Sequence, residues 1–173
     1  MTTSKGGPVS VSRRIDAPVA HVFALIADPN RHPEFDGSEM LRETPAQPFV
    51  SGVGDVFIMK MHNPEMGDYE MDNVVVEFEP NRRMAWEPVL RAASRPEDSG
   101  DIGDRAGHVW GFELAPDGPD ATLATETFDC SRAPEWLRRA VDDGRRWVEC
   151  MTTSLERLDR LCTAERSEPA GAA

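Results

Sequence analysis

Apolar and polar residues alternate along much of the chain. Residues 9–15 place Val9, Val11 and Ile15 on one face, which is the period of a half-buried strand. The same period of two returns in six later runs, separated by Pro, Asn, Asp and Gly; they cover 39–43, 53–61, 69–78, 84–86, 108–114 and 122–128. The pattern predicts antiparallel strands joined by hairpins.

Two other segments have helical spacing instead. After the first strand, Asp16 is expected to cap a helix, with Pro18 in its first turn and Pro29 at its end. A second short turn is expected over 30–35. The longer segment, 134–162, has an apolar stripe at Leu137, Val141, Gly144, Val148, Met151, Leu155, Leu158 and Cys162.

Gly144 interrupts this last helical pattern. A glycine inside a helix costs about 1 kcal/mol relative to alanine. It therefore marks either a break between a short and a long helix or a point of close approach, and we favour the break.

The order of these elements predicts an α+β fold. A curved antiparallel sheet has one face to cover, and the stripe of the last helix needs a sheet to bury it. The helix is therefore expected to lie in the concavity of the sheet. An apolar space left between them is where a ligand would bind.

Strand parity identifies the residues of this inner face. Methionine adapts to ligands of varied shape, and aromatic rings offer stacking faces. The predicted ligand-binding residues are Phe57, Met59, Met61, Met84, Trp86, Trp110, Phe112, Val148, Met151 and Leu155. The alternative is an ordinary packed core in which the same side chains fill the space.

The phase of residues 69–78 is left open by the pattern. One phase points Tyr69, Met71, Asn73 and Val75 inward, and the other points Asp72, Val74, Val76 and Phe78 inward. If the second set faces outward, it forms an apolar ridge suited to a homodimer contact.

Five blocks along the chain resemble the START-like superfamily (SRPBCC type), described as polyketide cyclase/dehydrase and lipid transport. They are IDAPVAHVFALIADPNRHPEF at 15–35, GVGDVF at 52–57, VVVEFEPNRRMAW at 74–86, WGFELAPDGPDATLATETF at 110–128 and TTSLERLDRL at 152–161. The resemblance implies a helix-grip fold, in which about seven strands wrap the C-terminal helix and two short helices follow the first strand. It implies lipid, hormone or polyketide ligands, and it transfers no catalytic residue.

Composition narrows the function classes. The chain of 173 residues suits a single domain, expected over 9–162, with disordered tails at 1–8 and 163–173. A net charge of −12 disfavours nucleic-acid and anionic-membrane partners. With no apolar run of membrane-spanning length and no secretory signal, a cytoplasmic location is expected.

Common catalytic and cofactor motifs are absent from the sequence, and we expect no cofactor and no metal. His108 shares the parity of the inner strand residues and could act as general acid or base, although a position at the cavity rim is the alternative. Tyr69 is a second weak candidate, with Glu126 and Asp72 as possible cavity carboxylates. The three cysteines are expected to be idle thiols.

Three functions are compatible with the sequence. The first is binding of a small, largely apolar molecule, with the Gly-rich connection 91–107 as a mobile gate. The second is a polyketide cyclase, aromatase or dehydratase that uses the acid and base groups of the cavity. The third is a structural or regulatory domain with a filled cavity, and cavity volume separates it from the other two.

Overall fold

Seven strands form one antiparallel sheet in the computed structural model, which describes residues 7–91, 94 and 105–167. Their order across the sheet is β1-β7-β6-β5-β4-β3-β2, so the first strand pairs with the last. The strands are β1 (Val9–Ile15), β2 (Leu41–Glu43), β3 (Val56–Asn63), β4 (Gly67–Glu79), β5 (Arg83–Leu90), β6 (Val109–Pro116) and β7 (Thr122–Asp129). All seven predicted strands are present, and β5 is longer than its apolar run.

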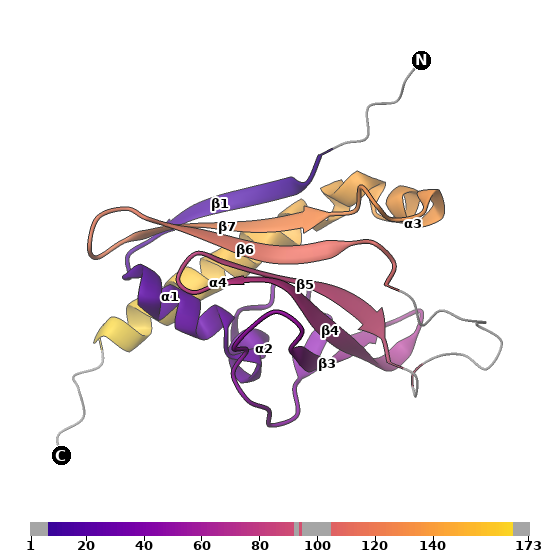
Figure 1. The fold of residues 1–173 in the computed structure, drawn as a ribbon, viewed down its shortest axis with the longest axis horizontal. Coiled ribbons are helices and arrows are strands. Elements are labelled where there is room, and N and C mark those ends of the chain that lie inside the picture. The colour runs from indigo at the N-terminus through magenta and orange to yellow at the C-terminus, as the bar shows by residue number, and fades with distance from the viewer. Residues whose placement is uncertain (1–6, 92–93, 95–104, 168–173) are drawn as a thin grey trace.

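The long C-terminal helix crosses the sheet, as Figure 1 shows, with its apolar stripe buried at Met151, Leu155 and Leu158. The α+β helix-grip fold is thereby confirmed. The helices are α1 (Val19–Ile26), α2 (His32–Phe35), α3 (Glu135–Ala140) and α4 (Val148–Ser167), with 3₁₀ turns η1 (Pro29–Arg31) and η3 (Asp142–Trp147). None of the helices in the described residues is long and apolar enough to cross a membrane.

The predicted break at Gly144 lies within η3. Asp143 has φ 48° and Gly144 has φ 91°, which are left-handed values that stop an α-helix. Gly144 is also a point of close approach, because a Cβ there would lie 2.8 Å from Val9 Cγ2 and 2.9 Å from Phe128 Cδ1. Because of this break, the short α3 does not continue along the axis of α4.

The start of α1 differs from the prediction. Pro18 is the N-cap residue, with no side-chain capping hydrogen bond, and the helix begins at Val19. The carboxylate of Asp16, two residues earlier, pairs with Arg14 instead. Asp16 is therefore too far from the first helical amides to cap them.

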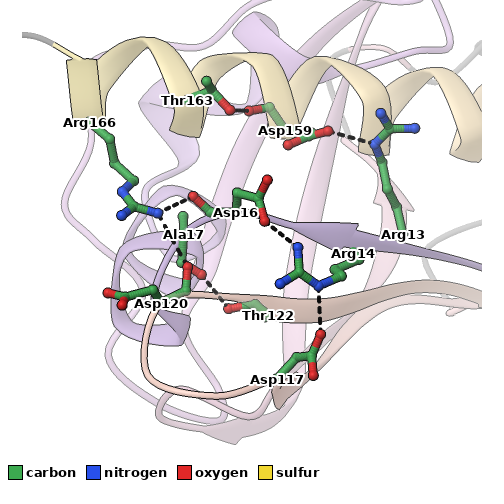
Figure 2. Close-up of polar contacts among 10 residues, drawn as sticks. All are labelled: Arg13, Arg14, Asp16, Ala17, Asp117, Asp120, Thr122, Asp159, Thr163 and Arg166. Atoms are coloured by element: carbon green, nitrogen blue, oxygen red, sulfur yellow. Dashed lines mark hydrogen bonds and ion pairs between the residues drawn. The ribbon is translucent and has the colours of Figure 1, made fainter.

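Helix α4 continues to Ser167, five residues beyond the predicted helix end at Cys162. Arg166 donates from Nη1 to the backbone carbonyls of Asp16 and Asp120 (Figure 2). These bonds attach the last turn of α4 to the β1–α1 connection and to the β6–β7 turn. Such distant anchors cannot be read from helical periodicity.

In strand β4, the set of residues that faces inward changes part-way along the strand. Val75 pairs with Trp86 and Glu77 pairs with Ala85, so a β-bulge lies between them. Before the bulge, the first set of residues faces inward, and Val75 is 1% exposed. After the bulge, Phe78 turns inward against Phe23, with ring centroids 5.6 Å apart. Neither phase holds for the whole strand, and Phe78 does not join an outer ridge.

Aromatic rings fill the part of the grip next to α2. His32 contacts Phe35, Phe57 and Trp86 at centroid distances of 5.3 to 5.8 Å. Phe112 continues the cluster, 6.2 Å from both Phe35 and Trp86. This end of the grip is packed, so any ligand space must lie on the other side of Trp86.

Candidate functional site

A pocket of about 420 Å³ occupies the grip on the side towards α3. It lies between the inner faces of β3 to β7, the α2–β2 connection and the α3–η3–α4 segment. Sulfur and indole side chains make up much of its wall. They are Met40, Met59, Met61, Met66 and Met71, and Trp86, Trp110, Trp136 and Trp147, the last four being all the tryptophans of the chain.

The predicted ligand-binding residues divide into two groups. Four of them line the pocket: Met59, Met61, Trp86 and Trp110. Of the other six, Val148 is 39% exposed, and the rest are buried side chains in contact with core neighbours; these are Phe57, Met84, Phe112, Met151 and Leu155. Parity gives the face of the sheet correctly for the strand residues, but part of that face is covered by α1, α2 and α4.

The weak catalytic candidates both line the pocket. His108 directly precedes β6, and burial lowers the pKa of its imidazole against the opposing effect of Glu87. Tyr69 lies on β4 and is half buried, so its pKa is raised. Asp72 faces the other side of the sheet, 3.7 Å from Arg91, and is not among the lining residues.

Glu126 is the most deeply buried acid of the pocket wall. It lies on β7 between Phe112 of β6 and Val11 of β1, and it is 7% exposed. Burial, together with the negative charge of Asp36, raises the pKa of Glu126 well above its ordinary value, and the Ser154 hydroxyl opposes the rise. Burial and the Asp36 charge therefore favour the neutral carboxylic acid form of Glu126.

Asp36 and Ser154 reach the pocket because Gly37 lets the α2–β2 connection pack onto α4. A Cβ at Gly37 would lie 2.2 Å from the carbonyl oxygen of Cys150 and 2.6 Å from the amide of Ser154. The Gly37 amide donates to Ser154 Oγ at 2.9 Å. The absence of a side chain at this one position therefore brings an acid next to the helix.

Unpaired polar atoms gather at this site. Within the described part of the chain, three buried side-chain polar atoms have no hydrogen-bond partner: His108 Nδ1, Glu126 Oε2 and Trp147 Nε1. All three belong to residues that line the pocket. Folded proteins rarely leave buried polar groups unpaired, so these atoms mark a place where a bound molecule would supply the partners.

His32 and the three cysteines have structural surroundings. His32 is 3% exposed and donates to the Ile26 carbonyl at 2.7 Å, a buried position that its turn-like sequence did not indicate. Burial raises the pKa of all three cysteine thiols, that of Cys162 to about 12. These thiols are protonated and unreactive at neutral pH.

Two further predictions concern the surroundings of the pocket. Most of the predicted mobile gate, namely 92–93 and 95–104, lies outside the described residues. Among the residues that are described, no group of three His, Cys, Asp or Glu side chains is arranged to hold a metal ion.

Glu126, named from the sequence as a possible cavity carboxylate, does line the pocket. Sequence reasoning missed several other lining residues, and one of them had a readable signal: Ser154 lies within the apolar stripe of α4. A polar residue at a core position indicates a buried polar contact. Trp136 and Trp147 gave no such signal, because their placement depends on the break at Gly144.

The chain belongs to the family described as polyketide cyclase / dehydrase and lipid transport, whose model matches residues 8–163. It is 34% identical over 131 residues to the uncharacterized protein Rv0088 of Mycobacterium tuberculosis. The match covers 75% of this chain and 51% of that protein, so the chain spans about half the length of the curated relatives it matches.

Solved structures share the fold at low sequence identity. Protein NE0264 from Nitrosomonas europaea superimposes with a TM-score of 0.66 at 15% identity, over 94% of this chain and 97% of that one. The polyketide cyclase-like protein Cgl2372 from Corynebacterium glutamicum gives 0.53 at 21% identity, over the whole of both chains. At these identities the likeness shows the fold alone.

Proposed function

We propose that this protein binds a small, largely apolar molecule in the pocket between the sheet and α3–α4. The carrying observation is the pocket itself: about 420 Å³ lined by five methionines and four tryptophans. This volume is within the range of small-molecule sites, about 300–1,000 Å³. The packed-domain alternative would need the space to be filled by side chains.

The nature of the wall supports a ligand of adaptable shape. Methionine side chains are flexible and polarizable, and indole rings offer large stacking faces. At the rim, Met66 is 51% exposed and Trp136 is 68% exposed. Large apolar side chains that line a pocket and also face solvent are typical of the entrance to a binding site.

The proposal is tested by looking for a carried ligand and for ligand-induced stability. Native mass spectrometry of gently purified protein should show an adduct, and some members of an apolar library should raise the melting temperature. Because all four tryptophans line the pocket, the same ligands should change the intrinsic fluorescence. If no ligand is carried and none stabilises the fold, the proposal is wrong.

A matched pair of variants on β4 locates the site. Met71→Trp places a larger side chain in the pocket, whereas Val74→Trp places it on the opposite face of the same strand. We expect ligand-induced stabilisation to be lost in Met71→Trp and kept in Val74→Trp. Equal stabilisation in both variants would place the ligand elsewhere.

A second candidate function is acid–base catalysis of ring closure or water loss. It is favoured by one observation: burial lowers the pKa of His108 and raises that of Glu126 within one pocket, which favours a neutral base beside a neutral acid. Turnover of a cyclising poly-β-keto thioester should then fall at least about 100-fold in His108→Gln. Unchanged turnover would exclude this role.

A further inference from the structure

The inner part of the pocket ends in a small polar group that we call the carboxyl end: Asp36, Glu126 and Ser154. Glu126 comes from the centre of β7, Ser154 from the first half of α4, and Asp36 from the turn after α2. All three line the pocket. Any molecule that fills the pocket must therefore meet two carboxyl groups at this end.

Of the two carboxyl groups, Asp36 has the better support for a negative charge. Its carboxylate accepts hydrogen bonds from Ser38 Oγ at 2.8 Å and from the Leu41 amide at 3.4 Å. Arg157 of α4 donates to its backbone carbonyl, and the guanidinium charge favours the ionised form. Burial is the largest influence and raises the pKa of Asp36 above its ordinary value, so the hydrogen bonds and the Arg157 charge offset it only in part.

Glu126 lacks comparable support. Its Oε2 atom has no hydrogen-bond partner within the described residues. The titratable and polar groups that face it are Asp36, from the α2–β2 connection, and Cys150 and Ser154, from α4. Two neighbouring buried carboxyl groups cannot both ionise cheaply, so the proton is held by Glu126, which can donate a hydrogen bond.

The lining residues in the described part of the chain include no lysine and no arginine. An anionic group at the carboxyl end would lie beside the charge of Asp36 with no lining cation to balance it. Trp147 Nε1, another unpaired atom of the pocket wall, is a donor only. The unpaired donors would therefore bind an acceptor oxygen of the ligand. Because of the Asp36 charge, that oxygen should be uncharged.

We propose that Glu126 selects the ligand: the pocket takes apolar molecules that present an uncharged acceptor oxygen to the Glu126 carboxyl, and it rejects molecules that carry a carboxylate. This inference rests on the proposed binding function and narrows its ligand class. It separates neutral oxygen-bearing molecules from free fatty acids, although both are largely apolar.

The test uses four probes with one ring system: 2-acetylnaphthalene, 2-ethylnaphthalene, 2-naphthoate and 2-(aminomethyl)naphthalene. Titration calorimetry at pH 6 should give the acetyl compound an affinity about 10-fold higher than the ethyl compound, the effect of one hydrogen bond. The carboxylate should bind at least about 10-fold more weakly than the ethyl compound, because of like-charge repulsion.

Variants assign the effect to Glu126. Glu126→Gln keeps a donor and should keep the preference for the acetyl probe, whereas Glu126→Leu should abolish it. As the pH rises through the pKa of Glu126, the wild type should lose affinity for the acetyl probe, because a carboxylate cannot donate; Glu126→Gln should not. Glu113→Gln, an exposed change on β6, is the control and should match the wild type.

The outcomes separate this inference from the function on which it rests. Equal affinity for the acetyl, ethyl and carboxylate probes, or tightest binding of the amine, would overturn the selection by Glu126 and leave apolar binding intact. If no probe and no library ligand binds, the proposed function fails and this inference with it. Should Glu126→Leu fail to fold, the pH profile of the wild type against Glu126→Gln decides the matter.

Discussion

At the scale of single residues, Gly37 has the clearest structural role. It is the point at which the α2–β2 connection packs on the backbone of α4, and it places Asp36 and Ser154 at the pocket. A side chain there must push the connection away from the helix, since backbone atoms cannot move aside as a flexible side chain can. The carboxyl end of the pocket depends on this contact.

Gly37→Ala is therefore expected to destabilise the fold by about 1–3 kcal/mol, the usual cost of overpacking. Urea unfolding would measure the change. Gly52→Ala is the matched control, because a Cβ at Gly52 meets nothing within 4 Å, and it should change the stability by less than about 0.5 kcal/mol. Similar effects of the two substitutions would contradict the close approach at Gly37.

His32 is expected to make stability fall in mild acid. Burial lowers the pKa of His32 to about 4, so between the ordinary value near 6.5 and about 4 the unfolded chain binds the proton and the folded chain does not. Stability from this group is complete above pH 6.5 and is lost as the pH falls.

Between pH 7 and pH 5, the loss amounts to about 2 kcal/mol. His32→Gln keeps a donor for the Ile26 carbonyl but cannot take up the proton. The wild type should therefore lose about 2 kcal/mol more than this variant over the same range, as measured by denaturant unfolding at each pH. Parallel pH profiles for the two proteins would show that His32 is not buried and neutral.

At the scale of elements, the last turns of α4 are attached to the opposite end of the grip from α3 (Figure 1). Arg166 donates to two backbone carbonyls, and Glu165 pairs with both His21 of α1 and Arg31 of η1. These contacts explain why the helix extends past its apolar stripe.

Arg166→Ala should lower the free energy of unfolding by about 1 kcal/mol, because two backbone carbonyls lose a charged donor. Arg160→Ala, at an exposed position on the same helix, is the control and should have a smaller effect. Thermal or urea unfolding of both variants decides the point. An Arg166 variant as stable as its control would mean that solvent replaces these bonds at no cost.

At the scale of the whole molecule, stability should differ between the two edges of the sheet. Strand β2 has three residues and an irregular register with β3. Strand β1, at the other edge, pairs in register with β7 over all seven of its residues and also packs against α4. Local opening should be easiest where few contacts must break.

Hydrogen exchange is the measurement that tests this difference. Amides of β2 should exchange at least about 100-fold faster than those of β1 that bond to β7. A ligand in the pocket should slow exchange in β3 to β6 more than in β1, because the former strands line the pocket. Equal exchange at the two edges would contradict the expected distribution of stability.

The sequence by itself determined the strands, the long helix, its break and the face that each regular strand turns inward. Residues 9–15 form β1 as predicted, and Gly144 interrupts the helix where its conformational freedom is needed. These features are local: they follow from period, from turn residues and from the φ values that glycine alone adopts easily.

Only the tertiary structure decided where the inner face is filled and where it is hollow. Parity placed Phe57 and Met59 on one face, but the His32 ring of α2 covers Phe57 while Met59 lines the pocket. The bulge in β4 and the contact of Gly37 with α4 could likewise not be predicted from the sequence. Each depends on segments distant in the chain that arrive on the same surface, and the pattern of a single segment does not contain that information.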